Sequence, residues 1–136
     1  MDLIRRNTDY ALRLMVNLAV SYPNGCTSAK TLSQEEDVSY PLTCKLLHQL
    51  NVAGFVRSTM GLKGGFSLNR LPSKISLLDV IEVIQGTLVV NRCVLNKEAC
   101  PRQATCPITK KLKGLQDYLA KSLTGITLAD LAKTIK

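Results

Sequence analysis

The spacing of apolar residues predicts three helices in the part of the chain that ends at Gly54. Those among residues 11–19 lie three or four positions apart, so they form one face of an amphipathic helix that Asn7 or Thr8 can cap. The turn residues Tyr-Pro-Asn-Gly at 22–25 predict its end. A short helix follows around 29–32, and a third begins at an N-cap on Ser39. The buried stripe of this third helix comprises Leu42, Leu46, Leu47 and Leu50.

A β-hairpin is predicted directly after the third helix. Residues 55–59 and 66–69 have the composition of strands, and residues 60–65 between them contain three glycines. The plain alternative is a surface hairpin without a role. Two short helices followed by a basic, glycine-tipped hairpin are instead typical of a winged helix-turn-helix. The predicted fold class is therefore mainly α with a small β-wing.

Helical patterns return in the second half of the chain. Ser76 with Asp79 predicts a capped helix that ends at Gly86. A long helix begins at Pro107, and Thr127 opens a short final one. The long helix carries a narrow apolar stripe of Ile108, Leu112, Leu115 and Leu119. This stripe predicts pairing with a second copy, and the alternative is that it packs back on its own domain.

These patterns divide the chain into two parts. Residues 1–75 are expected to form a winged helix-turn-helix DNA-binding domain, and residues 76–136 a cysteine loop and dimerisation helices that are integral with it. The third helix is expected to enter the major groove, and the hairpin to lie near the minor groove or the phosphates. The candidate DNA-binding residues are Ser39, Tyr40, Thr43, Cys44, Lys45, His48, Arg57, Met60 and Lys63.

The charge of the chain indicates the class of partner that it binds. The chain has 18 Lys and Arg against 10 Asp and Glu, a net charge of +8. The excess is not a basic tail, but it concentrates around 57–74 and again around 92–113, where Glu98 is the only acid. A folded basic surface indicates a polyanion partner, and the alternative is a charge kept for solubility.

The sequence also excludes several classes. Its apolar runs are too short for a membrane span, and polar residues interrupt the first of them, so it does not resemble a secretory signal. We therefore expect a cytoplasmic protein without a membrane partner. No nucleophile–base pair, paired catalytic carboxylates or phosphate-binding glycine motif is evident, so we expect no enzyme activity.

Three of the five cysteines are clustered. They follow the pattern Cys93-x6-Cys100-x5-Cys106, within a chain expected to stay in a reducing compartment. Three thiolates on one loop suit a soft metal centre, although the fourth ligand would come from elsewhere. The absence of a CxxC pair makes a zinc ribbon a poor fit. The alternative is three free thiols in a surface loop.

Motif order gives a family resemblance over essentially the whole chain. The segment Thr-Asp-Tyr-Ala-Leu-Arg at 8–13, the wing Gly-x-x-Gly-Gly-Phe at 61–66 and three cysteines before a long helix resemble the Rrf family of bacterial regulators. The resemblance implies a homodimer whose long helices cross, with a DNA-binding winged helix in each protomer. In the cluster-bearing members it implies an iron–sulfur cluster on the three cysteines, with a 4Fe–4S form favoured and a 2Fe–2S form as the alternative.

The fourth ligand distinguishes the subgroups of this family. IscR-like members place a histidine three residues after the last cysteine, where this chain has Thr109. NsrR-like members use an aspartate of the first helix, given by the partner chain, which here is Asp9. The resemblance is thus nearest to the NsrR-like members, although the first cysteine gap is one residue longer than expected there. Otherwise, Asp9 is simply an acid at a helix start, where it favours the dipole.

The resulting hypothesis is a homodimeric repressor of transcription that binds a palindromic operator. It would sense nitric oxide, redox state or iron–sulfur status through a cluster on Cys93, Cys100 and Cys106. A clusterless regulator that uses the cysteines as thiol switches is one alternative. An iron–sulfur carrier is another, but it would leave the wing and the basic charge unexplained.

Overall fold

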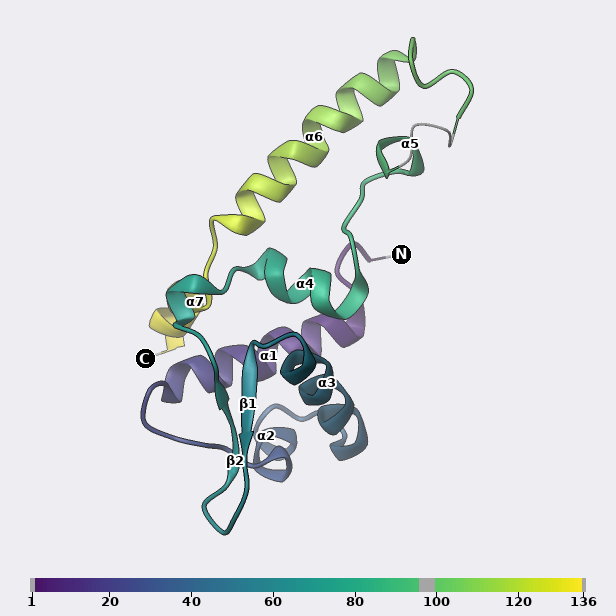
Figure 1. Cartoon of the computed structure of the whole chain (residues 1–136). Helices are drawn as coiled ribbons and strands as arrows, with labels where there is room; N and C mark the ends of the chain where they lie inside the picture. Colours follow the sequence, from purple (N-terminus) through teal and green to yellow (C-terminus); the bar gives the residue numbers. More distant parts are fainter. Residues whose placement is uncertain (1, 96–99, 136) are drawn as a thin grey trace.

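The computed structural model describes residues 2–95 and 100–135, so the charged residues Lys97 and Glu98 lie outside the described part. The chain folds into a helical body with one small sheet and a long helical arm (Figure 1). Its elements are α1 (Arg6–Ser21), α2 (Ala29–Glu35), α3 (Tyr40–Val52), β1 (Val56–Thr59), β2 (Gly65–Leu68), the 3-10 turn η1 (Pro72–Lys74), α4 (Leu77–Gln85), α5 (Arg92–Leu95), α6 (Pro107–Thr124) and α7 (Leu128–Ile135). The mainly α fold with a small β-wing predicted from the sequence is confirmed.

Helix α1 lies at the centre of the body. It packs against α3, α4 and the C-terminal helix α7, and its fully buried Leu14 and Met15 contribute to the core. Burying a leucine side chain contributes roughly 1.5–3 kcal/mol, so this shared face holds the helices together. Other core members are Leu18, Leu32, Leu46, Leu47, Leu50, Val56, Ile75, Val80 and Leu128.

The start of α1 differs from the prediction. The helix begins at Arg6, and neither Asn7 nor Thr8 caps it, because both lie inside the first turn. The side chain of Gln85, at the end of α4, organises this end instead. Its Oε1 accepts hydrogen bonds from the Arg5 N–H (3.0 Å) and the Thr8 hydroxyl (2.7 Å). A contact 77 residues along the chain thus replaces the local cap.

The β1–β2 hairpin is a rigid wing. Its strands pair antiparallel, with Val56 opposite Leu68. Thr27, from the segment before α2, forms an antiparallel β-bridge with Phe66 of β2 through two hydrogen bonds, at 2.9 and 2.8 Å. A Cβ on Gly65 would lie 2.6 Å from the Thr27 backbone, so only glycine permits this close approach. The wing is therefore fastened to the helix-turn-helix as well as to itself.

Two reciprocal caps set the starts of α4 and α7. The Asp79 backbone N–H donates to the Ser76 hydroxyl, and the Ser76 N–H donates to the Asp79 carboxylate. Thr127 and Asp130 repeat the arrangement. A backbone bridge joins Ser76 to Thr127, so both caps lie at the same place. The predicted caps of both helices are confirmed.

Residues 88–124, which we call the arm, leave the body and end in α6 (Figure 1). The Gln116 side chain holds the two limbs of the arm together, because it accepts from the Val90 N–H (2.8 Å) and donates to the Leu88 carbonyl. The predicted long helix with Gly125 at its end is confirmed. Within residues 2–95 and 100–135, none of the helices combines the length and apolar content that crossing a membrane requires.

Candidate nucleic-acid interface and cysteine segment

Helix α3 presents a polar face away from the core. Tyr40, Lys45 and His48 are exposed, and Cys44 is half-buried between them. Ser39 occupies the predicted N-cap position and is exposed, but its side chain makes no capping hydrogen bond. The structure thus places five of the six predicted DNA-binding residues at 39–48 where a ligand can reach them.

Thr43 is the exception among the predicted α3 contacts. Its side chain is fully buried, so it does not belong to the outward face. Its helical position explains this, because residues 43, 46, 47 and 50 share one face and the last three are core leucines. The Thr43 hydroxyl has no hydrogen-bond partner among the described residues. In this structure Thr43 is a core residue, and the prediction that it meets a base edge is corrected.

Tyr40 and Cys44 lie one helical turn apart and interact. A hydrogen bond with the Cys44 side chain, then the charge of that group, then slight burial raise the pKa of Tyr40 above its ordinary value of 10.0. The phenol therefore keeps its proton at neutral pH. A neutral phenol can donate a hydrogen bond to a phosphate oxygen or to an acceptor on a base edge.

The wing offers exposed cations on its first strand and at its tip. Arg57 on β1 and Lys63 in the tip are exposed, as is Met60 between them. Leu62, which is not among the residues predicted from the sequence to bind DNA, is fully exposed beside Lys63. The exposure of Leu62 could have been predicted from the sequence, because an apolar residue between glycine and lysine at a hairpin tip cannot reach a core.

The three clustered cysteines lie on the arm. Cys93 is in α5, Cys100 follows it, and Cys106 is the N-cap of α6; all three are free and half-buried. The Gln103 side chain donates a hydrogen bond to the Cys93 carbonyl, which ties α5 to the segment before α6. The donor set suits a soft iron centre chemically. Within the described part of one chain, however, no three Cys, His, Asp or Glu side chains are close enough to hold a metal ion.

The start of α6 activates the thiol of Cys106. Hydrogen bonds from the backbone N–H and the hydroxyl of Thr109, then from the Ile108 N–H, lower its pKa below the ordinary 9.0, with slight burial opposing them. These donors belong to the first turn of α6, where unpaired N–H groups favour a negative charge. Thr109 occupies the position where IscR-like proteins are expected to carry histidine. In this chain its hydrogen bonds stabilise the thiolate form of Cys106.

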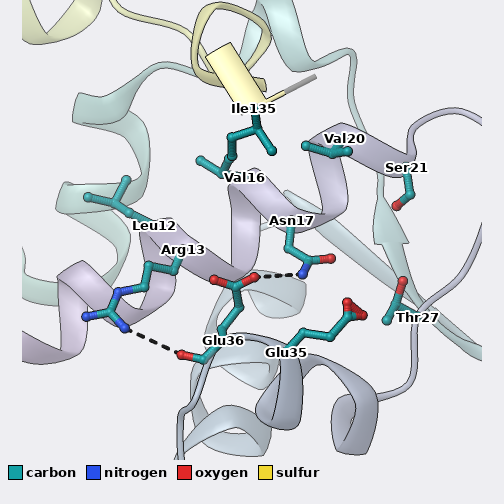
Figure 2. A pocket seen from close by; sticks show the side chains of 10 residues that line it. All are labelled: Leu12, Arg13, Val16, Asn17, Val20, Ser21, Thr27, Glu35, Glu36 and Ile135. Atoms are coloured by element: carbon teal, nitrogen blue, oxygen red, sulfur yellow. Dashed lines mark hydrogen bonds between the residues drawn. The ribbon is translucent and has the colours of Figure 1, made fainter. Parts of the chain in front are cut away.

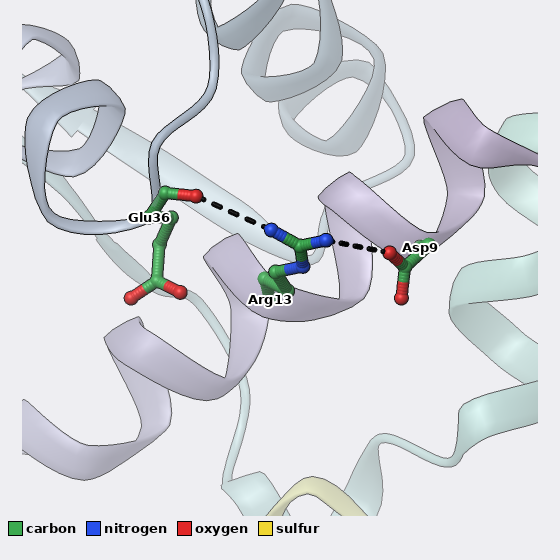
Figure 3. Close-up of polar contacts among 3 residues, drawn as sticks. All are labelled: Asp9, Arg13 and Glu36. Atoms are coloured by element: carbon green, nitrogen blue, oxygen red, sulfur yellow. Dashed lines mark hydrogen bonds and ion pairs between the residues drawn. The ribbon is translucent and has the colours of Figure 1, made fainter.

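Asp9 lies in the first turn of α1. Its carboxylate pairs with Arg13 at 3.0 Å, and the same guanidinium donates to the Glu36 carbonyl at the end of α2, at 3.4 Å (Figure 3). The pair is about half exposed, so its contribution to stability is small. Arg13 thereby connects Asp9 to the helix-turn-helix.

A cavity of about 500 Å³ opens between α1, the end of α2 and α7. Figure 2 shows its apolar side formed by Val16 and Ile135, and its polar side by Asn17 and Glu36, whose side chains share a 2.8 Å hydrogen bond. It contains none of the site residues that the sequence predicts. The cavity therefore adds nothing to the nucleic-acid interface described above.

Comparisons with known proteins agree with this architecture. The family described as "Rrf2: Iron-dependent Transcriptional regulator" matches residues 4–134. The protein rrf2 of Nitratidesulfovibrio vulgaris is 28% identical over 125 residues, which cover 91% of this chain and 83% of that protein.

Two solved structures share the fold. CymR (YrzC), the global cysteine regulator of B. subtilis, superposes with a TM-score of 0.82 at 28% identity, over 98% of each chain. IscR of T. potens gives a TM-score of 0.78 at 27% identity, over 98% of this chain and 88% of that one. The two neighbours therefore cover both the body and the arm.

Proposed function

Because this chain belongs to the Rrf2 family of transcriptional regulators, we propose that it is a cytoplasmic, homodimeric repressor that binds a palindromic operator and responds to the state of its arm cysteines. Regulators of this family bind DNA and are not enzymes, as the sequence analysis predicted for this chain. The observation that carries the proposal is the shared exposure of the α3 polar face and the basic wing.

The two DNA-binding elements are proposed to act differently. Lys45 on α3 reads base edges in the major groove, whereas Lys63 at the wing tip neutralises a phosphate. Lys45→Ala should then relax discrimination at one position in each half-site, by about 1–3 kcal/mol. Lys63→Ala should weaken binding to all sequences alike. Identical sequence profiles for the two variants would contradict this division of roles.

Salt provides a direct test of DNA binding. Two chains of +8 give a dimer of +16. Contacts with roughly 6–10 phosphates would lower the affinity by a factor of about 10³–10⁵ between 50 and 200 mM salt. The measurement is fluorescence anisotropy with duplexes selected from a random library. A flat salt response, together with no selected sequence, would overturn the proposal.

The homodimer is proposed from the uncovered stripe of α6. Ile108 is 64% exposed and Leu115 is 47% exposed, although both belong to the apolar stripe. A second copy of α6 would cover these side chains and fix the separation of the two α3 helices, which must match half-sites about one turn of DNA apart. Leu115→Glu should convert a dimer into a monomer in analytical ultracentrifugation. A wild-type chain that is monomeric at micromolar concentration would contradict the dimer.

For the sensor, we propose that Cys93, Cys100 and Cys106 hold an iron–sulfur cluster, with Asp9 of the partner subunit as the fourth ligand. Such a cluster supplies a centre that nitric oxide, oxygen or iron scarcity can alter. The lowered pKa of Cys106 favours the thiolate that a metal requires. Recruitment of Asp9 would break its pair with Arg13, which also holds the end of α2.

The arm is connected to α3 by packing. Residues at the C-terminal end of α6 continue into Thr127, which is bridged to Ser76 at the start of α4. Helix α4 packs against both α1 and α3. We propose that a change in the angle of the arm is passed to the DNA-binding helix through α4, which packs against α6 as well as α3.

The sensor proposal is tested by the anaerobically purified protein. We expect visible absorption bands and bound iron and sulfide, which each of the three Cys→Ala substitutions on the arm removes while the dimer persists. Asp9→Ala should retain a cluster that is lost faster. A colourless protein after anaerobic reconstitution would refute the cluster. Wild-type stability of the cluster in Asp9→Ala would remove Asp9 from the ligand set.

The second candidate is a thiol switch without a cluster. It is supported by the separation of the three cysteines within one chain and by the likeness to a global cysteine regulator. In this case the activated Cys106 would be the first thiol to be oxidised. Operator binding that changes with a thiol oxidant in iron-free protein, and reverses with dithiothreitol, would favour this candidate over the cluster.

A further inference from the structure

The wing tip carries two apolar side chains that the rest of the chain leaves uncovered. Met60 is 93% exposed, and Leu62 is fully exposed. They are the two most exposed large apolar side chains in residues 2–94 and 100–135. Single exposed apolar residues are common on protein surfaces, but two at the tip of one basic hairpin are a feature that burial in the core of this chain does not explain.

The tip turn places Leu62 at the far end of the hairpin. The Gly64 N–H donates to the Gly61 carbonyl at 3.0 Å, which closes a four-residue turn. Leu62 and Lys63 are its two central residues, so an apolar side chain and a cation project together. Gly61 has a φ of +107°, a backbone conformation that other residues rarely adopt.

The base of the hairpin keeps this tip in a fixed direction. The strands are paired from Val56 to Thr59, and Thr27 adds hydrogen bonds on the outer edge of β2. A Cβ on Gly64 would overlap the Thr59 carbonyl oxygen, so the two strand ends lie in close contact. A tip with this support can keep its position when it contacts a ligand.

We propose that Leu62, with Met60 beside it, enters the minor groove as an apolar wedge that partly unstacks one base step, while Lys63 contacts the adjoining phosphate. The inference rests on the proposed DNA-binding role of α3 and the wing. Leucine and methionine are side chains that wedge between base steps and kink DNA. Pyrimidine–purine steps such as TA unstack most easily, so the wing would read deformability instead of hydrogen-bond pattern.

The experiment uses the full-length protein and a duplex selected from a random library by the wild type. Two versions of this duplex carry either a TA or an AA step beneath the wing, with 2-aminopurine at that step as a probe of unstacking. We expect the wild type to bind the TA version about tenfold more tightly and to raise its fluorescence. Leu62→Ala should lose about tenfold in affinity for the TA version, together with the fluorescence rise.

Three further variants separate the wedge from charge and from general stability. Leu62→Met keeps an apolar wedge and should retain the preference for TA. Leu71→Ala alters a half-exposed leucine outside the tip and should change neither affinity nor fluorescence. Lys63→Ala should reduce the dependence of binding on salt and leave the preference for TA in place.

The outcomes that overturn the wedge are distinct from those that overturn DNA binding. If Leu62→Ala binds both duplexes as the wild type does and gives the same fluorescence, Leu62 does not enter the groove. If it lowers the salt dependence as Lys63→Ala does, its effect is on the position of the cation and the wedge is refuted. If the wild type selects no duplex at all, the proposed function itself fails.

Discussion

Two fully buried threonines provide an internal comparison of hydrogen-bond energetics. The Thr8 hydroxyl donates to Gln85 Oε1 at 2.7 Å, whereas the Thr43 hydroxyl has no partner among the described residues. Both side chains are 0% exposed, and both lie in helices. We predict that Thr43→Val and Thr8→Val change the free energy of unfolding in opposite directions.

The magnitudes follow from what each substitution removes. Threonine and valine have nearly the same volume and similar helix propensity, so cavity and propensity effects are small. A buried hydroxyl without a partner costs about 1–3 kcal/mol, and its removal from Thr43 should therefore raise the free energy of unfolding by about 1–2 kcal/mol. Thr8→Val should lower it by about 1 kcal/mol, because Gln85 Oε1 still accepts from the Arg5 N–H.

The assay is urea unfolding followed by circular dichroism, at one fixed protein concentration because the proposed dimer would make the measured stability depend on concentration. Operator binding is measured on the same samples. Since Thr43 lies inside the body, Thr43→Val should leave the affinity and the sequence profile unchanged. A loss of stability in Thr43→Val would show that its hydroxyl has a partner. A loss of sequence discrimination would place that residue at the DNA after all.

Three other substitutions test the wing, the arm cysteine and the long helix. Gly64→Ala should weaken operator binding about tenfold and leave the helical content unchanged, because the new Cβ overlaps the backbone of β1. Gly25→Ala is the matched control, because a Cβ at that position meets no other atom. Iodoacetamide at pH 7 should alkylate Cys106 faster than the other arm cysteines, since a lowered pKa means more thiolate at neutral pH. Thr109→Val should slow the alkylation of Cys106 and shift the pH dependence of its rate to higher pH. Gly114→Ala should raise the free energy of unfolding by about 1 kcal/mol in urea, because the added methyl stands in open space on α6.

Local signals in the sequence were sufficient for most of the elements. The cap of Ser76 by Asp79, the glycines of the wing and the stop at Gly125 each involve residues within a few positions of one another. Turn and cap chemistry of this kind depends on neighbouring backbone, so it can be recognised without knowledge of the tertiary fold. The winged helix-turn-helix was predictable for the same reason.

Features that depend on distant residues were not predictable. The start of α1 is set by Gln85, which lies far along the chain, so the expected caps were wrong. Thr43 is a different case, because it was assigned to the DNA on its polar residue type although the local helical spacing of residues 43, 46, 47 and 50 already placed it with the core leucines. The cysteine spacing indicated a soft-metal site, but the Gln103 contact and the activation of Cys106 arise from how the arm folds.

The bridge between Ser76 and Thr127 has a consequence for how such proteins diversify. Two backbone hydrogen bonds of 2.9 Å pair the outgoing and returning chain at this point. The Leu77 N–H donates to the Ile126 carbonyl, and the Leu128 N–H donates to the Ile75 carbonyl. Residues 77–126 therefore run between two paired ends, and within them α4 packs on the body before the arm leaves it. Because the entropy of closing a loop grows only logarithmically with its length, residues can be gained or lost near the arm tip at little cost to the body. If the arm is the sensor, as proposed, its length can therefore change without rebuilding the body that carries α3 and the wing.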